Sequence, residues 1–177
     1  MPTKRKNIYE GRIIKLYRDE INIKGRKFIR ETIVHPGSVV IIPVLNVKAE
    51  NVILIKQFRY AINKYMLELP AGTLKPDETP FACAGRELEE ETGYKAGFLK
   101  KISEFYPSPG IMTEKMHLFV ASSLIKSKPN PDPDEKIKIV KINLNDAIKM
   151  IFNGKIMDGK TISGILMLKS LYGKIFK

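Results

Sequence analysis

The chain has 177 residues, of which 44% are hydrophobic, so its size and composition suit one globular domain with a sizeable core. The formal net charge is +12 at pH 7, yet residues 77–91 carry a local balance of −5, which leaves +17 on the remainder. A basic chain favours an anionic partner. That partner is either nucleic acid or a phosphorylated small molecule. Because the lysines and arginines are scattered rather than clustered with aromatics, solvated lysines explain the charge better than a nucleic-acid-binding surface does.

The N-terminal part is expected to form strands. Residues 8–35 contain alternating apolar side chains, with a polar break at residues 18–20 and a hairpin turn at Lys24-Gly25. This stretch has little apolar core of its own. We therefore treat residues 1–37 as a strand region that packs on a partner subunit, and residues 38–177 as the main domain of the same unit.

The main domain alternates short apolar runs with turns. Strands are predicted at residues 38–45, 52–57, 98–105, 117–124 and 137–142, and the first two of these segments are short and rich in Val and Ile. A turn at residues 48–51 separates the first two strands, and a loop at residues 106–115 separates the next two. An exposed loop with three prolines is expected at residues 129–134.

Residues 79–92 predict a helix with clear ends. Thr79 can accept a hydrogen bond at the N-terminus, and Gly93 suits the left-handed residue that ends such a helix. Gly85, inside the helix, costs about 1 kcal/mol relative to alanine. We expect this glycine to allow close approach of a neighbouring loop.

Two further helices are expected at residues 146–152 and 161–172, the second N-capped by Thr161.

Residues 154–161 match the phosphate-binding pattern G-x4-G-K-T. A helical segment rather than a strand precedes them, so we interpret them as a turn between two helices. Strands around two or three helices predict a mixed α/β (α+β) sandwich.

Acidic side chains are concentrated on the predicted helix at residues 79–92. Glu87 lies three residues before Glu90 and four before Glu91, so the three carboxylates project from one side of the helix. Like charges so placed repel unless a cation lies between them. Carboxylate oxygens suit a hard divalent cation such as Mg²⁺, which also bridges phosphates. Taken alone, such an acidic run more often means a solvated helix face.

The stretch from Gly72 to Tyr94 resembles the Nudix box, G-x5-E-x7-R-E-U-x-E-E-x-G-U, in which U is an apolar residue. The residues that fill its specified positions are Gly72, Glu78, Arg86, Glu87, Leu88, Glu90, Glu91, Gly93 and Tyr94. The flanking segments at residues 30–37, 58–60, 67–72 and 108–114 resemble ADP-ribose pyrophosphatases. The resemblance implies a Nudix-type α/β/α sandwich with a mixed sheet, plus a small N-terminal antiparallel sheet.

The resemblance also implies a role for each matching residue. Mg²⁺, with Mn²⁺ as an alternative, would be held by the backbone carbonyl of Ala71 and the carboxylates of Glu87, Glu90 and Glu91. Glu114 would be the general base, Glu90 would hold metal or orient water, and Arg86 would orient the box carboxylates. The implied substrate-binding residues are Arg59 for phosphate, Arg30 and Glu31 for the adenosine part across a subunit interface, and Ser108 and Gly110 for the terminal ribose.

The resemblance implies Mg²⁺-dependent hydrolysis of the pyrophosphate of ADP-ribose to AMP and ribose 5-phosphate. Together with the N-terminal strand region, it also implies a homodimer. A sugar nucleotide or a dinucleoside polyphosphate stays open as the substrate. A non-catalytic nucleotide- or RNA-binding module also stays open, although a pure binder has no need of the box carboxylates. No apolar run reaches the length of a membrane span, and the single Cys83 fits a reducing compartment, so we expect a cytoplasmic protein that does not enter a membrane.

Overall fold

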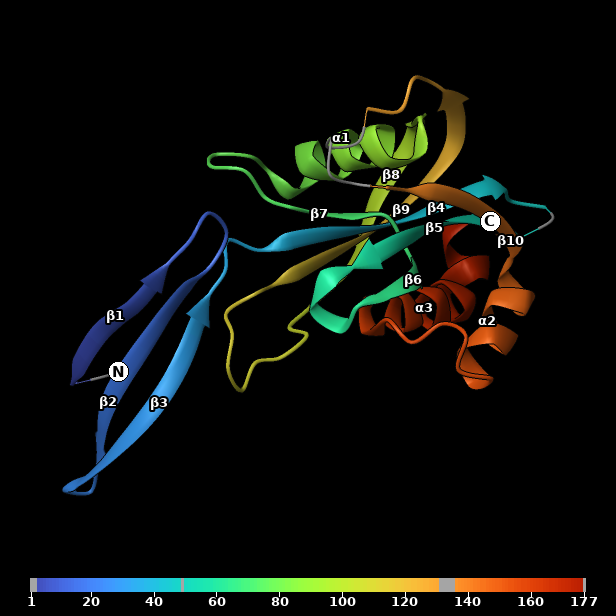
Figure 1. Ribbon diagram of the computed structural model, residues 1–177. Helices are drawn as coiled ribbons and strands as arrows, with labels where there is room; N and C mark the ends of the chain where they lie inside the picture. The colour runs from blue at the N-terminus through green and yellow to red at the C-terminus, as the bar shows by residue number, and fades with distance from the viewer. Residues whose placement is uncertain (1–2, 49, 131–135, 177) are drawn as a thin grey trace.

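A seven-stranded mixed sheet is the centre of the fold in a computed structural model that describes residues 3–48, 50–130 and 136–176. Helix α1 covers one face of this sheet, helices α2 and α3 cover the other, and a three-stranded sheet projects from one end (Figure 1). The helices are α1 (Pro80–Thr92), α2 (Leu144–Phe152), α3 (Gly159–Ile175) and the short 3-10 helix η1 (Tyr60–Ile62). The strands of the central sheet are β4 (Ser38–Asn46), β5 (Asn51–Arg59), β6 (Lys64–Glu68), β7 (Ala71–Thr73), β8 (Tyr94–Phe105), β9 (Met116–Lys126) and β10 (Lys138–Asn143).

Strand β4 lies in the middle of this sheet because both of its faces are apolar. The strand order is β10-β5-β4-β9-β8; β4 pairs in parallel with β9 and antiparallel with β5 and β7. Val39 and Ile41 pack towards α1, whereas Val40, Ile42 and Val44 pack towards α2 and α3. A continuous Val- and Ile-rich run is typical of a strand buried on both faces. The predicted α/β/α sandwich with a mixed sheet is therefore confirmed.

The N-terminal sheet is antiparallel, as predicted, and has the order β1-β2-β3. Its strands are β1 (Lys4–Glu10), β2 (Lys15–Ile23) and β3 (Arg26–Val34). The predicted polar break at residues 18–20 is wrong, because β2 runs through it. Asp19 is buried and accepts hydrogen bonds from Arg5 on β1, at 2.7 and 2.8 Å, and from the Thr32 hydroxyl on β3, at 2.8 Å. Cross-strand partners thus satisfy a carboxylate that looked like a strand breaker.

The predicted strands of the central sheet and the three predicted helices are all present, with small shifts at their ends. The loop predicted at residues 129–134 lies outside the described residues from residue 131 onward, and so does Ala49 of the predicted turn. The division into residues 1–37 and 38–177 stays a prediction. None of the helices among the described residues is long and apolar enough to cross a membrane.

The N-cap of α3 differs from the prediction. Asp158, not Thr161, caps the helix by accepting from the Thr161 backbone N–H at 3.0 Å. The buried Thr161 hydroxyl instead donates to Asp158 at 2.6 Å and accepts from the backbone N–H of Leu69 at 2.7 Å. Helix α2 precedes this turn, so the structure confirms that residues 154–161 connect two helices rather than follow a strand.

Candidate active site

Helix α1 presents the acidic residues because both of its ends are fixed by local sequence. Thr79 accepts from the Ala82 N–H at 3.2 Å, Pro80 occupies the first turn, and Gly93 ends the helix with φ of +67°. These are favourable residues for the start and the end of a helix. Glu87, Glu90 and Glu91 therefore all lie on one regular helix, as the sequence predicts.

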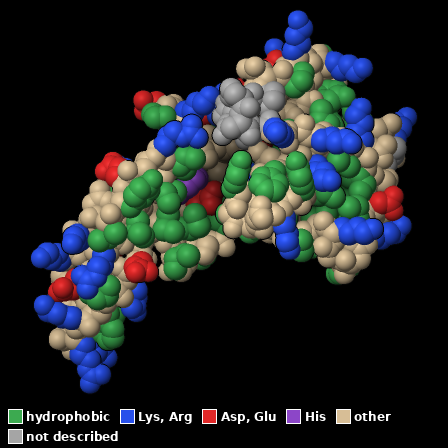
Figure 2. Space-filling view, in the orientation of Figure 1, with side chains coloured by type: hydrophobic (Ala, Val, Ile, Leu, Met, Phe, Trp, Pro, Cys, Tyr) green, Lys and Arg blue, Asp and Glu red, His purple; other side chains and the backbone are tan. Residues whose placement is uncertain are grey.

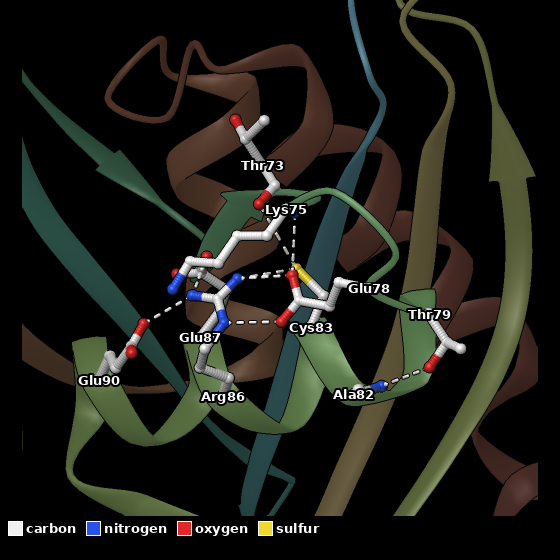
Figure 3. A network of polar contacts seen from close by, with 9 residues as sticks. All are labelled: Thr73, Lys75, Glu78, Thr79, Ala82, Cys83, Arg86, Glu87 and Glu90. Carbon is white, nitrogen blue, oxygen red and sulfur yellow. Dashed lines mark hydrogen bonds and ion pairs between the residues drawn. The ribbon is translucent and has the colours of Figure 1, made fainter. Parts of the chain in front are cut away.

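Arg86 is the centre of a carboxylate cluster on this helix (Figure 3). Its Nε and Nη2 atoms donate to the two oxygens of Glu78 at 2.7 and 2.9 Å, and its Nη1 donates to Glu87 Oε1 and Glu90 Oε2, both at 2.7 Å. The hydrogen bonds from Arg86 lower the pKa of Glu78 to about 2. In turn, chiefly through its hydrogen bonds with Glu78, the pKa of Arg86 is raised well above its ordinary value. One guanidinium thus keeps three like charges close together.

Glu78 also braces the loop that precedes the helix. Its Oε2 accepts from the backbone N–H of Lys75 at 3.1 Å, which fixes the loop between β7 and α1. Cys83 lies behind this contact, where Arg86 Nη2 approaches its sulfur at 3.3 Å. Burial and the neighbouring Glu78 raise the pKa of the Cys83 thiol to about 12. A buried thiol with so high a pKa is a structural residue rather than a nucleophile.

Gly72 and Ala71 bring strand β7 against the helix carboxylates. A Cβ added at Gly72 would lie 1.9 Å from Cδ and from Oε1 of Glu87, so only glycine leaves room for this carboxylate. Glu91 is 4% exposed and accepts from the backbone N–H of Ala71 at 2.9 Å. The expectation that Gly85 is the site of close approach is wrong, because a Cβ there would meet nothing within 4 Å. The close approach lies at Gly72 instead.

The donor chemistry of this cluster suits a hard divalent cation. Glu87, Glu90 and Glu91 supply carboxylate oxygens, which are the ligands that Mg²⁺ and Mn²⁺ prefer. Within the described residues, no three His, Cys, Asp or Glu side chains are arranged as a closed metal site. Glu87 and Glu90 are instead each paired with Arg86. The carboxylate donors fit a hard divalent cation, and the ligand roles stay a prediction.

Glu114 lies on the other side of β4, just before β9 begins. Its Oε1 accepts a hydrogen bond from the Ser38 hydroxyl at 2.8 Å, and His35 Nδ1 lies 3.9 Å from the same oxygen. The surface is hollowed between the N-terminal sheet and the main domain, and acidic and histidine side chains show in this hollow (Figure 2). The Glu114 side chain is only 13% exposed, so it is held rather than free on a loop.

The predicted substrate-binding residues are spread over several elements. Arg30 and Glu31 lie on β3 of the projecting sheet, where Arg30 Nη1 donates to the Ile29 carbonyl at 3.0 Å. The Ser108 carbonyl closes a turn by accepting from the N–H groups of residues 111 and 112, and Gly110 has open space at its Cα. The structure does not bring these residues onto the cluster around Arg86, and their roles stay predictions.

Arg59 belongs to a second ionic network that the sequence did not reveal. It donates to both oxygens of buried Glu68, at 2.8 and 2.6 Å, and Glu68 also pairs with Lys160. Lys160 lies 3.0 Å from Asp158 at the start of α3. Burial opposes ionisation of Glu68, but the hydrogen bonds from Arg59 and Lys160 outweigh it and lower its pKa. A charged residue inside the apolar run at residues 67–71 was the signal available in the sequence.

Comparisons with known proteins decide the family. A family model of the NUDIX domain matches residues 34–160. The chain belongs to the Nudix family. The predicted Nudix membership is thereby confirmed, together with the expectation of an enzyme of the Nudix pyrophosphatase type.

Three related proteins match between 66% and 94% of the chain. It is 37% identical to the ADP-ribose pyrophosphatase of Bacillus subtilis (strain 168) over 168 residues, which span 93% of this chain and 90% of that protein. It is 34% identical to the methanol dehydrogenase activator of Bacillus methanolicus, over 94% of this chain and 90% of that protein. A GDP-mannose pyrophosphatase of Shigella flexneri is 38% identical over 126 residues, 66% of this chain and 65% of that protein.

A solved structure shares the Nudix fold at low sequence identity. The crystal structure of an ADP compounds hydrolase superposes with a TM-score of 0.85 and covers 98% of this chain and 95% of that one. Its sequence identity is 20%, so this likeness concerns the fold. The coverage includes the projecting N-terminal sheet as well as the main domain.

Proposed function

We propose that this Nudix protein hydrolyses the pyrophosphate of ADP-ribose to AMP and ribose 5-phosphate in a Mg²⁺-dependent reaction. The observation that carries the proposal is its 37% identity, over 93% of the chain, to the ADP-ribose pyrophosphatase of Bacillus subtilis. The carboxylate cluster around Arg86 supports it, because hydrolysis of an anionic pyrophosphate needs charge neutralisation that hard cations on oxygen ligands supply. Mn²⁺ is the alternative cation.

The proposed metal-binding roles are those that the resemblance to the Nudix box implies for the matching residues. The carbonyl of Ala71 and the carboxylates of Glu87 and Glu91 would hold the cation, with Glu90 as a further ligand. When bound, the cation neutralises the phosphate oxygens and lowers the pKa of a coordinated water. Arg86 keeps the carboxylates in place through the four hydrogen bonds described above.

Glu114 is the proposed general base. It accepts a proton from the attacking water while the water oxygen forms a bond to one phosphorus and the bridging oxygen leaves with the other phosphate. A carboxylate bound to a cation is a poor proton acceptor, which favours Glu114 over the box carboxylates. Arg59 would meet a phosphate of the substrate while Glu68 holds its guanidinium. Arg30 and Glu31 would contact the adenosine part, and Ser108 and Gly110 the terminal ribose.

A substrate panel tests the proposed reaction. The protein is incubated with ADP-ribose, GDP-mannose, a dinucleoside polyphosphate and a nucleoside triphosphate, each with Mg²⁺ or with EDTA, and the products are identified by chromatography. We expect AMP and ribose 5-phosphate from ADP-ribose, and no product with EDTA. In Glu87→Gln and Glu91→Gln, turnover should fall by about two orders of magnitude or more while the fold persists, since each loses a charged oxygen ligand. Near-normal turnover in both variants would overturn the metal assignment.

A sugar nucleotide is the second candidate substrate. The support is the 38% identity to a GDP-mannose pyrophosphatase over 126 residues. That match leaves about a third of each chain uncovered, whereas the ADP-ribose pyrophosphatase matches almost the whole length. A higher kcat/KM for GDP-mannose than for ADP-ribose would favour this alternative.

We also propose that the protein is a homodimer that buries the N-terminal sheet. This sheet exposes apolar side chains, and Figure 2 shows them gathered on its visible face. The largest exposed ones on its strands are Ile8, Tyr9, Ile23, Phe28 and Ile29, and Ile13 is exposed in the turn between β1 and β2; all six are 37% to 57% exposed. Exposed apolar patches of this kind mark interaction surfaces. Light scattering should give twice the mass of one chain at micromolar concentration, and a monomer would contradict the proposal. A cytoplasmic location stays a prediction.

A further inference from the structure

The loop that carries Glu114 is attached to the junction between the N-terminal sheet and the main domain. The Ile33 N–H donates to the Ile111 carbonyl at 2.8 Å, and the Thr113 N–H donates to the Ile33 carbonyl at 2.9 Å. The His35 N–H donates to the Thr113 hydroxyl at 3.0 Å. The Ser38 N–H donates to the carbonyl of residue 115 at 3.0 Å. Residues 33–38 therefore fix the backbone on both sides of Glu114.

Ser38 fixes the Glu114 side chain as well as the backbone next to it. Ser38 is the first residue of β4 and is 6% exposed, and its hydroxyl donates to Glu114 Oε1 at 2.8 Å. His35 cannot replace it as the donor through Nδ1, because that nitrogen accepts the Gly37 N–H at 3.0 Å and lies 3.9 Å from the carboxylate. A buried hydroxyl on a central strand is a rigid donor, whereas glutamate has three side-chain torsions to restrict.

We infer that Ser38 is a positioning residue that holds the Glu114 carboxylate in one orientation for proton abstraction. The inference rests on the proposed function, in which Glu114 is the base. Without the hydroxyl, Glu114 keeps its chemistry but samples several rotamers, so a smaller fraction of bound substrate meets a correctly oriented base. The Ser38 side chain makes no described hydrogen bond with Arg86 or its carboxylates. Its backbone pairs with Thr73 of β7, and a change of the side chain alone leaves that pairing in place, so substrate and cation binding should be retained.

Four variants test this inference by steady-state kinetics with ADP-ribose and Mg²⁺. Ser38→Ala removes the hydroxyl, Ser38→Thr keeps it, and Ser122→Ala removes a hydroxyl that is equally buried, 5% exposed, on β9. Glu114→Gln removes the proposed base. We expect Ser38→Ala to lower kcat by about tenfold with KM and the Mg²⁺ requirement unchanged. Ser38→Thr should recover most of kcat, and Ser122→Ala should match the wild type.

Combining Ser38→Ala with Glu114→Gln separates positioning from general structural damage. If Ser38 acts through Glu114, the double variant should be no slower than Glu114→Gln alone, and thermal unfolding should show both single variants folded. An additional tenfold loss in the double variant would overturn the inference, and so would an unchanged kcat in Ser38→Ala beside a strongly reduced kcat in Glu114→Gln. If the wild type releases no AMP from ADP-ribose, the proposed reaction is wrong. If Glu114→Gln keeps full activity, Glu114 is not the base. Either result would also refute the positioning role of Ser38.

Discussion

Gly72 and Gly85 form a matched pair for testing whether the position of Glu87 matters. A Cβ at Gly72 would lie 1.9 Å from Cδ and Oε1 of Glu87, whereas a Cβ at Gly85 would meet nothing within 4 Å. Neither glycine has positive φ, so alanine can adopt the backbone conformation at both positions. Gly72→Ala should therefore act through Glu87, and Gly85→Ala should leave the site unchanged.

The expected magnitude follows from the contact distances. Non-bonded carbon atoms approach to roughly 3.5 Å, so Gly72→Ala must displace the Glu87 carboxylate by about 1.5 Å. That shift breaks its 2.7 Å hydrogen bond with Arg86 Nη1. Loss of a charge-assisted hydrogen bond costs about 1.5–3 kcal/mol of stability, and a misplacement of about 1 Å in a site costs on the order of 100-fold in rate. Gly85→Ala should instead gain about 1 kcal/mol from helix propensity.

The assay combines kinetics with equilibrium unfolding. AMP release from ADP-ribose gives kcat/KM at saturating Mg²⁺, and urea titration gives the free energy of unfolding of the same samples. We expect about 100-fold lower kcat/KM and reduced stability for Gly72→Ala, against normal kcat/KM and increased stability for Gly85→Ala. Equal activity in the two variants would show that the site tolerates displacement of Glu87, and the assigned role of that carboxylate would be wrong.

Other parts of the structure make separate predictions. Arg86 holds the pKa of Glu78 at about 2, below its ordinary value of 4.5, so the stability it contributes is complete above about pH 4.5 and is lost as the pH falls towards 2. Urea unfolding across this range should show a smaller pH dependence in Glu78→Gln. Thr161→Val leaves the buried Leu69 N–H without its acceptor and should lower the free energy of unfolding in urea by about 1–3 kcal/mol. Thr161→Ser keeps the hydroxyl and should retain most of that free energy. Cys83, with a pKa of about 12, should react with a thiol reagent at pH 8 only after denaturation, and rapid labelling of the native protein would contradict its burial.

Features encoded within a few residues could be predicted from the sequence. Helix α1 was predicted to within a residue because Thr79, Pro80 and Gly93 mark its ends locally. The run at residues 38–45 was recognised as a strand because it is short and rich in Val and Ile, and the structure shows that it is buried on both faces. The apparent break at residues 18–20 was misjudged because the partners of Asp19 lie on two other strands, and no local pattern reveals them.

The part of the site that lies within one stretch of sequence could be predicted, whereas its contacts between distant segments could not. The spacing on α1 placed the carboxylates on one helix, and the family pattern placed Arg86 beside them. The contact between Ser38 and Glu114 joins residues 76 positions apart, and the pair of Glu68 and Lys160 joins residues 92 positions apart. Such pairs depend on how β4 meets β9 and how α3 meets β6. They arise from tertiary packing and leave no periodic signal in the sequence.

The backbone pairing of Ile33 with the loop before β9 limits how far the N-terminal sheet can be treated as a separable module. A chain shortened to residues 38–177 would leave the Ile111 carbonyl and the Thr113 N–H without their partners on either side of Met112. Deleting the sheet would therefore perturb the loop beside Glu114 even if the main domain still folded. Burial of the sheet against a second subunit would restrict the motion of β3. Because Ile33 of β3 forms two backbone hydrogen bonds with residues 111 and 113, the loop beside Glu114 would become less mobile as well. Conditions that favour the dimer would then also increase kcat, and conditions that dissociate it would lower kcat.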